Sequence, residues 1–184
     1  MKVLHTGWPM ETDTARRHRD LVVLIGLEPE SPEVEYGWIE PAQAISGAAK
    51  VFAVRRFWEK PNKMLAQVLQ LRGYLWNSFV MVASVQALLD IIESALPALY
   101  RSFACLTPLF SSGAESKVMV RLYDRLDEVN FSHQVLSLKP ERLAVLKVTG
   151  VRWNDLGEPK RVMASLDMAG VRPQWIEKTI PQFA

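Results

Sequence analysis

The chain has 184 residues, of which 49% are hydrophobic and 23% charged, and its 22 basic and 20 acidic side chains give a net charge of +2. This balance is typical of a globular domain; it excludes disorder and collagen-like repeats and lacks the basic excess of a dedicated nucleic-acid-binding protein. Cys105 is the only cysteine, which excludes an intramolecular disulfide and a cysteine-rich zinc site. The sequence has no signal-peptide pattern and no apolar stretch near the ~20 residues that span a bilayer. We therefore expect a cytoplasmic protein that binds neither membranes nor nucleic acid polymers.

The first half of the chain alternates strand and helix patterns. Residues 1–20 are predicted to form a polar N-terminal segment, and residues 21–184 the main domain. Residues 21–26 are a continuous apolar run, typical of a strand buried on both faces. Residues 51–58 predict a second strand. Residues 62–71 predict a helix with four apolar side chains on one face: Met64, Leu65, Val68 and Leu69.

The second half continues the alternation. Residues 75–83 predict a third buried strand, and Ser84 occupies the N-cap position of a following helix that Pro97 ends or kinks. Its apolar stripe consists of Val85, Leu88, Leu89, Ile92 and Leu99. Further elements are a helix at 114–126, a strand at 143–148 and a last helix framed by Pro159 and Gly170. Strands that alternate with helices predict an α/β layered fold.

The nine glycines are spread along the chain, and Gly150 and Gly157 are the nearest pair. Phosphate-binding loops need clustered glycines, because only glycine lets backbone N–H groups close around phosphate oxygens. The sequence therefore contains neither a Walker loop nor a dinucleotide-binding fingerprint.

Four short motifs occur in a fixed order: Glu35-Tyr36-Gly37, Phe57-Trp58-Glu59-Lys60-Pro61, Trp76-Asn77-Ser78 and Trp153-Asn154-Asp155-Leu156-Gly157. Their order and spacing resemble the sugar-phosphate nucleotidyltransferases, and most closely the bacterial mannose-1-phosphate guanylyltransferases. The resemblance extends over residues 19–170. It implies a doubly wound, Rossmann-like α/β sheet with flanking helices. The activity it implies is the joining of a nucleoside triphosphate to a sugar 1-phosphate with release of pyrophosphate.

The resemblance also implies a role for each candidate site residue. The attack of one phosphate on another brings two anions together, so the site needs cations and a metal ion. By resemblance, Lys60 contacts phosphate and is the catalytic cation, while Glu59 and Asn77 bind sugar hydroxyls. The backbone of Gly37 approaches the sugar, and Asp155 is one of two carboxylates that hold Mg²⁺.

Each of these residues also has a plainer interpretation. Glu59 and Lys60 can be a surface ion pair before a proline turn. Asp155 can be a turn residue that bonds its own backbone, with Gly157 as the turn glycine. Ser132-His133 suggests a hydrolase triad only weakly, because the chain has no Gly-x-Ser-x-Gly elbow. The six tryptophans can stack sugars or simply form core and pocket walls.

Three features depart from the family pattern. Phe79 stands where the Trp-Asn-Ser-Gly motif has its glycine, and Ser137-Leu138 stand where a Glu-Lys pair is usual. The glycine-rich loop and the other metal aspartate are missing, so the chain aligns with the C-terminal portion of the catalytic domain. We expect a truncated form, inactive alone, of an enzyme that makes GDP-mannose from GTP and mannose 1-phosphate. The alternatives are a non-catalytic interaction module derived from the same fold and a fragment without function.

An incomplete sheet has a consequence for assembly. The strands at 21–26 and 75–83 are expected to lack partners on one side, which exposes a strand edge and an apolar face. Such edges and faces favour association. We therefore expect a homodimer or larger assembly, unless residues 1–20 fold back and cover this surface.

Overall fold

The chain divides into two compact units at Gly150. One unit lies within residues 4–150 and the other within the residues from 151 onward. The computed structural model describes residues 14–106 and 115–175. The first unit holds all the described strands, and the second holds one described helix, α6 (Pro159–Ala169). The sequence patterns predict no boundary at Gly150.

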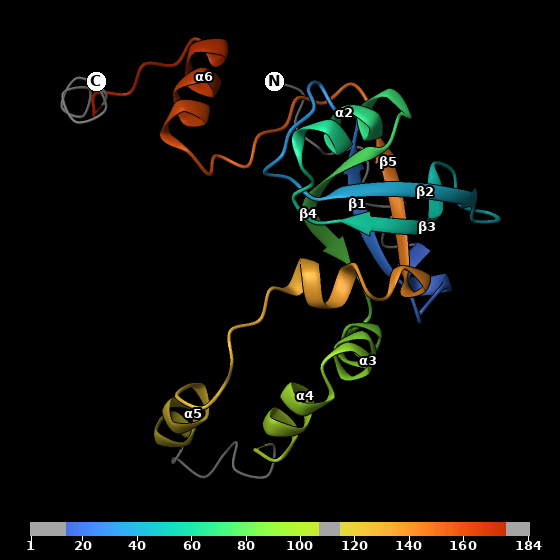
Figure 1. Cartoon of the computed structure of the whole chain (residues 1–184), viewed down its shortest axis with the longest axis vertical. Helices are drawn as coiled ribbons and strands as arrows, with labels where there is room; N and C mark the ends of the chain where they lie inside the picture. Colours follow the sequence, from blue (N-terminus) through green and yellow to red (C-terminus); the bar gives the residue numbers. More distant parts are fainter. Residues whose placement is uncertain (1–13, 107–114, 176–184) are drawn as a thin grey trace. The chain divides into compact units, whose positions relative to one another are not determined.

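The five described strands close into a barrel in the order β1-β4-β2-β3-β5 (Figure 1). They are β1 (Val22–Leu27), β2 (Trp38–Ala44), β3 (Val51–Trp58), β4 (Leu75–Val82) and β5 (Leu143–Val148). β1 and β5 run parallel, and the other neighbouring pairs are antiparallel. The mixed α/β class with a sheet and flanking helices is therefore confirmed. The predicted unpaired edge is wrong for the described strands, because β5 returns to pair with β1 and each strand has two neighbours.

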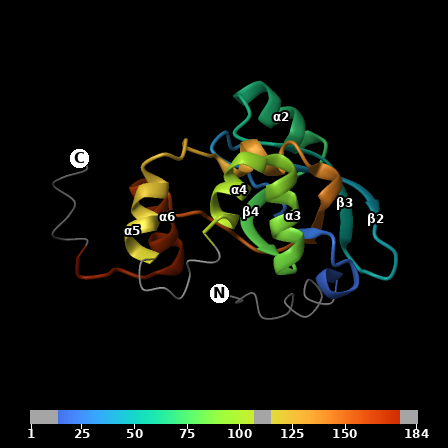
Figure 2. The ribbon, with the colours of Figure 1, turned by 90° about the horizontal axis from the view of Figure 1, so that it is seen from below.

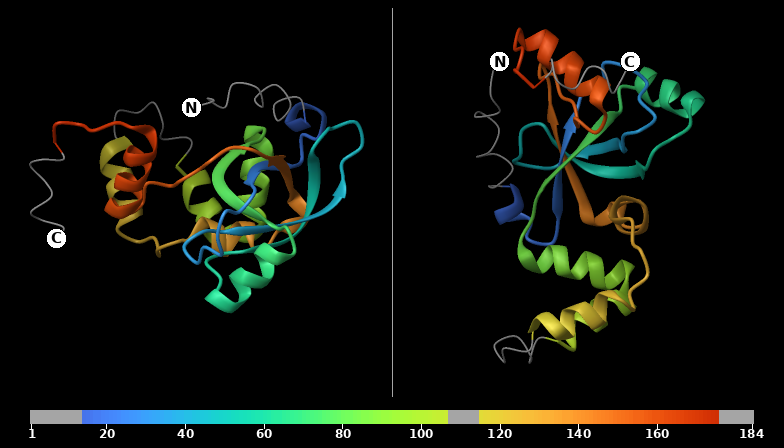
Figure 3. Two further views of the ribbon diagram at one scale, coloured as in Figure 1. Left: turned by 90° about the horizontal axis from the view of Figure 1, so that it is seen from above. Right: turned by 90° about the vertical axis from the view of Figure 1, so that its left-hand side faces the viewer.

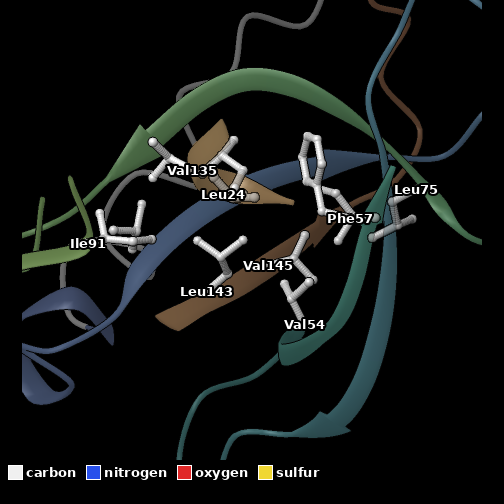
Figure 4. Packing of buried hydrophobic residues seen from close by; sticks show 11 residues of the cluster. Leu24, Val54, Phe57, Leu75, Ile91, Val135, Leu143 and Val145 are labelled. Atoms are coloured by element: carbon white, nitrogen blue, oxygen red, sulfur yellow. The ribbon is translucent and has the colours of Figure 1, made fainter. Parts of the chain in front are cut away.

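The strand β1 is buried on both faces, as its apolar run predicts. Val22 and Leu24 belong to the main core cluster, part of which Figure 4 shows, together with Val135 and Ile91 from outside the barrel strands. Val23 belongs to a second cluster on the other face. That cluster includes Ala15, so residues of the N-terminal segment cover part of the face that was expected to be exposed.

Short helices lie at the ends of the barrel and beyond them. In Figures 1 and 3, α2 (Lys63–Leu71) lies at one end of the barrel and α3 (Val85–Ala95) at the other; Figure 2 views it from the α3 end. This unit also contains α4 (Pro97–Ala104), α5 (Glu115–Tyr123), the π-helix η2 (Ser132–Leu136) and the 3₁₀-helix η3 (Pro140–Arg142). None of the helices described is both long and apolar enough to cross a bilayer.

The predicted apolar faces of two helices are partly wrong. In α2, Met64 is 78% exposed, and the helix packs through Ala66 and Leu69 instead. In α3, Val85 is 77% exposed, and the buried residues are Ala87 and Ile91. Part of each predicted apolar stripe is therefore exposed.

The helix ends follow the sequence signals. The side chains of Asn62 and Ser84 accept N-cap hydrogen bonds from Leu65 N and Ala87 N. Pro97 ends the predicted long helix, because a new helix, α4, starts at this residue. α6 begins at Pro159 and ends at Gly170, whose φ of +64° is left-handed.

The strand β2 and the π-helix η2 are among the elements that the sequence patterns do not predict. The strand β2 contains Pro41, which argues against a strand because proline cannot donate to the ladder. The structure tolerates this proline at a register shift, beyond Trp38 and Ile39, which are the residues that pair with β4. The π-helix η2 has no characteristic sequence pattern, and it lies in the segment where the chain diverges from the family motifs.

Replacing Ser84 by alanine is expected to destabilise the first unit by about 1–2 kcal/mol. The Ser84 hydroxyl accepts from Ala87 N at 3.0 Å and donates to the Arg19 carbonyl at 2.9 Å, so it caps α3 and fastens the segment before β1. Urea denaturation measures the change. Ser94→Ala, an exposed position in α3, is the control, with a change of at most about 0.5 kcal/mol. Equal midpoints for the two variants would contradict this role of Ser84.

Candidate functional site

A row of three tryptophans aligns the motifs found in the sequence. Trp38 in β2 pairs with Trp58 in β3 on one side and with Trp76 in β4 on the other. Because these strand pairs are antiparallel, the residue before Trp38 lies beside the residues after Trp58 and Trp76. The pairing register therefore brings together Gly37, Glu59 and Asn77, which lie far apart in the sequence.

The absence of a side chain at Gly37 makes this arrangement possible. A Cβ atom there would lie 2.7 Å from Phe57 Cζ, 3.2 Å from Glu59 Oε2 and 3.3 Å from Asn77 Cβ. The Asn77 backbone N–H donates to the Gly37 carbonyl at 2.7 Å. A side chain at position 37 would therefore crowd the Phe57 ring, and the glycine leaves bare backbone between Glu59 and Asn77.

The Lys60 ammonium lies at the surface next to a carboxylate. Its Nζ atom is 3.2 Å from Glu35 Oε2, and both side chains are about half exposed. The ion pair that the sequence suggested between Glu59 and Lys60 is thus formed with Glu35 instead. The Lys60 backbone has a φ of +45°, a left-handed conformation that is costly for a side chain with a Cβ atom. An exposed ion pair contributes little to stability, so an incoming anion can replace Glu35 at modest cost.

The Glu59 carboxyl is half-buried, and its burial raises its pKa above the usual value. A hydrogen bond from the Ser132 side chain acts in the opposite direction, as do the nearby charges of Lys60 and His133. Ser132 and His133 lie in η2, and neither was assigned to this site from the sequence. The sequence did draw attention to Ser132-His133, but as a weak candidate for a hydrolase triad rather than as part of this site.

The buried side chain of Asn77 organises a bulge in β4. Its Oδ1 atom accepts from Phe79 N at 3.1 Å, while the Ser78 hydroxyl donates to the Ile25 carbonyl at 2.8 Å. The register with β1 shifts here, because Leu24 pairs with Met81 but Gly26 pairs with Asn77. With Oδ1 engaged in the bulge, the amide N–H groups are the part of Asn77 suited to donate to a ligand.

Phe79 occupies the bulge with a φ of +59°. This left-handed conformation is the physical reason for a glycine at this point of the motif, because a Cβ atom is disfavoured there. The phenylalanine ring is largely exposed and meets the Phe131 ring edge-on, with centroids 6.4 Å apart. The departure from the motif is therefore accommodated by strain in the backbone and an aromatic contact with the residue before η2.

Asp155 belongs to the second unit and takes part in a local loop. Its Oδ1 atom accepts from Gly157 N at 3.0 Å and lies 3.0 Å from Arg161 Nη1. Leu156, rather than Gly157, has the left-handed backbone, with a φ of +55°. The turn-residue interpretation thus describes the contacts that Asp155 makes within its own unit.

The described residues do not fit a magnesium site by themselves. No group of three or more His, Cys, Asp or Glu side chains that could hold a metal ion occurs in the described ranges. Asp155 offers a single carboxylate, and the Arg161 guanidinium neutralises one of its oxygens. The residues in these ranges therefore support no reaction step through a metal ion on their own.

The chain belongs to the nucleotidyl transferase family. The model of that family matches residues 10–167, which is most of the sequence. The resemblance to sugar-phosphate nucleotidyltransferases that the four motifs suggested is confirmed by this match and by the names of the relatives.

Two curated relatives indicate the branch of the family. The chain is 29% identical over 149 residues to a mannose-1-phosphate guanylyltransferase of Escherichia coli, covering 74% of this chain. It is 26% identical over 152 residues to the alginate biosynthesis protein AlgA of Pseudomonas putida, covering 78% of this chain. In both comparisons the matched part spans 30% of the relative's length.

Two solved structures share the fold. A mannose-1-phosphate geranyltransferase from Thermus thermophilus superimposes with a TM-score of 0.69 at 23% identity, covering 91% of this chain and 44% of that one. A mannose-6-phosphate isomerase from Helicobacter pylori superimposes with a TM-score of 0.61 at 17% identity, covering 81% of this chain and 56% of that one. The fold expected from the sequence is thus found in known structures.

At position 79, glycine is expected to give a more stable protein than alanine by about 1 kcal/mol, because the backbone is left-handed. Phe79→Gly and Phe79→Ala both remove the ring contact with Phe131, so their difference in urea-denaturation midpoint isolates the backbone conformation. Val80 in the same strand is the control. At that position the alanine variant should be more stable than the glycine variant by about 0.5–1 kcal/mol. If the Phe79→Ala variant is as stable as the Phe79→Gly variant or more stable, the backbone at this residue is not strained.

Proposed function

We propose that the chain is the sugar 1-phosphate-binding portion of a mannose-1-phosphate guanylyltransferase. The full reaction joins GTP and mannose 1-phosphate to give GDP-mannose and pyrophosphate. The observation that carries this proposal is the convergence of Gly37, Glu59 and Asn77 on one place by strand register, with the Lys60 ammonium on the residue that follows Glu59. The name of the Escherichia coli relative, mannose-1-phosphate guanylyltransferase, supports mannose as the sugar and guanine as the base.

Each residue has a definite task in this proposal. The Glu59 carboxylate accepts hydrogen bonds from sugar hydroxyls, and the Asn77 amide donates to a sugar oxygen. The bare backbone at Gly37 lets the sugar ring lie against the strands. Lys60 leaves Glu35 and neutralises the sugar phosphate while that phosphate attacks another phosphate, which makes it the catalytic cation of this portion.

The nucleotide and its metal require residues beyond those described. The 184 residues contain no clustered glycines that could cradle a triphosphate. When bound, Mg²⁺ would neutralise phosphate charge, and Asp155 would supply at most one of its ligands. We therefore infer that the 184-residue polypeptide binds the sugar phosphate but does not complete the reaction alone. We place the protein in the cytoplasm, where nucleoside triphosphates are available.

The exposed side chains of α2 favour an interaction module as the second candidate function. Met64, Val68 and Leu71 are spaced by four and three residues on one helix face, and all three are exposed. A row of this kind suits contact with a partner chain or a second copy. Because the described strand edges are paired, the homodimer that we expect would have to form through such side chains.

The polypeptide is expected to show no turnover of GTP and mannose 1-phosphate in the presence of Mg²⁺. A pyrophosphate-release assay measures this, with the Escherichia coli mannose-1-phosphate guanylyltransferase as the positive control. Turnover that disappears in Asp155→Ala would show that these residues contain a complete catalytic site, and would overturn the inference.

Lys60→Ala is expected to weaken the binding of mannose 1-phosphate by about tenfold or more, because a charge-assisted hydrogen bond to phosphate is lost. Titration calorimetry with the 184-residue polypeptide measures the change. Lys63→Ala, which removes an exposed lysine at the start of α2, is the matched control and should bind like the wild type. Equal heats for the two variants would remove Lys60 from the site, and no heat with the wild-type polypeptide would contradict the proposed function itself.

A further inference from the structure

We propose that a cavity at the hairpin end of the barrel is a binding site for a phosphate group. The cavity has a volume of about 200 Å³. Among the described residues, residues 14, 17 and 18 line one side of it, and residues 46–49, in the loop that joins β2 to β3, line the other. In Figures 2 and 3 the short blue turn before β1 lies beside this loop.

The cavity is separate from the candidate sugar site. β2 starts at Trp38, next to Gly37, and its seven residues end at Ala44, just before the loop. A strand of this length spans roughly 20 Å. A ligand in the cavity would therefore not touch the residues of the sugar site, and its binding does not depend on the function proposed above.

The lining of the cavity is rich in hydrogen-bond donors. Arg17 and His18 supply nitrogen donors, and Thr14 and Ser46 supply hydroxyl groups. None of the described residues that line the cavity is acidic. The planar fork of a guanidinium matches phosphate oxygens, and imidazole and hydroxyl groups add single donors. Donors on two segments suit a tetrahedral oxyanion, which has acceptor oxygens in several directions, better than a planar carboxylate.

The charge of the two segments also favours an anion. Residues 14–20 and 46–50 carry one acidic side chain, Asp20, and four Lys or Arg side chains, all exposed: Arg16, Arg17, Arg19 and Lys50. The whole chain has a net charge of only +2, so this basic excess is local. A local excess of one sign raises the concentration of counter-ions at the surface.

The backbone on both sides of the cavity is held in place. Ala15 is buried in the second core cluster, and Ala48 packs against the same cluster. Arg17 Nη1 donates to the Gly47 carbonyl at 3.4 Å, which joins the two segments. This hydrogen bond is long and therefore weak, and a guanidinium has five N–H donors, so Arg17 can turn toward a phosphate while the backbone stays fixed. A site with a fixed backbone loses little conformational entropy when it binds a ligand.

The loop consists of two consecutive turns with left-handed residues. They are closed by hydrogen bonds to the carbonyls of Ile45 and Ala48, at 3.2 and 3.4 Å. The third residues of the two turns, Gly47 and Lys50, have φ values of +75° and +61°. This conformation is easy for glycine but costly for lysine, and such strain is common at ligand-binding sites. The strained lysine therefore agrees with a role of the loop beyond joining two strands.

The size of the cavity limits what it can enclose. Its volume lies below the range of about 300–1,000 Å³ that is typical of pockets for drug-sized ligands. The cavity therefore suits a phosphate group alone, and the rest of a larger phosphorylated molecule would lie in solvent. Inorganic phosphate and a phosphate monoester share this chemistry.

Titration of the 184-residue polypeptide with inorganic phosphate, followed by ¹H–¹⁵N NMR at constant ionic strength, tests the site. The backbone amide signals of Arg17, His18 and Gly47 should shift and saturate, whereas sodium chloride should leave them unchanged. A second titration with glycerol 1-phosphate distinguishes the two sources of the phosphate group. Saturable shifts with either compound would uphold the site and show which source it accepts. The absence of such shifts with both compounds would overturn the proposal.

Variants separate a built site from general charge attraction. Arg17→Ala should weaken phosphate binding by about tenfold or more, because a charge-assisted hydrogen bond is lost. Arg16→Ala is the matched control: it removes the same charge from the neighbouring exposed position, which does not line the cavity, and should change the affinity by less than about twofold. Equal weakening in the two variants would overturn the proposal.

Two further variants keep the test decisive. Ser46→Ala removes an exposed hydroxyl without disturbing the core and should weaken binding by about threefold, which covers the case in which Arg17→Ala does not fold. Lys60→Ala should leave the shifts unchanged, because that ammonium lies at the other end of β2. Full affinity in Ser46→Ala, or loss of the shifts in Lys60→Ala, would overturn the proposal and leave the proposed function standing.

Discussion

The pairing register of β2 is the constraint on which the site depends. Trp38 faces a tryptophan on each neighbouring strand, and Tyr36 packs edge-on against one of them, Trp76, with ring centroids 5.1 Å apart. A slip of one residue would turn every side chain of the strand to the other face. Large aromatic rings on three adjacent strands make such a slip costly, so they fix the position of Gly37 between Glu59 and Asn77. The tryptophans thereby act on the site without belonging to it.

Around this fixed row, the backbone is strained at two places. Lys60 and Phe79 both have left-handed conformations, and each is within two residues of Glu59 or Asn77. Such conformations persist only where the surrounding structure determines them, as the hydrogen bond from Phe79 N to the Asn77 side chain does at Phe79. The strands therefore fix the positions of Gly37, Glu59 and Asn77, and the left-handed residues lie directly beside them.

Local sequence signals predicted the elements that obey local rules. The strands β3 and β5 begin and end as expected, and Ser84, Pro97, Pro159 and Gly170 mark helix ends because capping is decided within a few residues. The motifs also named Gly37, Glu59 and Asn77, which the structure brings together. Features that depend on long-range contacts could not be predicted from such local signals. Barrel closure, the strand around Pro41 and the packing of η2 against the barrel core depend on residues far apart in sequence.

The closure of the barrel has a consequence for how this chain folds. The parallel contact that completes the ring joins the start of β1 to the start of β5, Val22 to Leu143. Loop-closure entropy must be spent before a contact of such long range contributes, so proteins built on these contacts fold more slowly than helical ones. During synthesis, β1 to β4 leave the ribosome well before β5, and the apolar edges of β1 and β3 stay unpaired until it arrives. Folding of the first unit is thus completed only by its last strand.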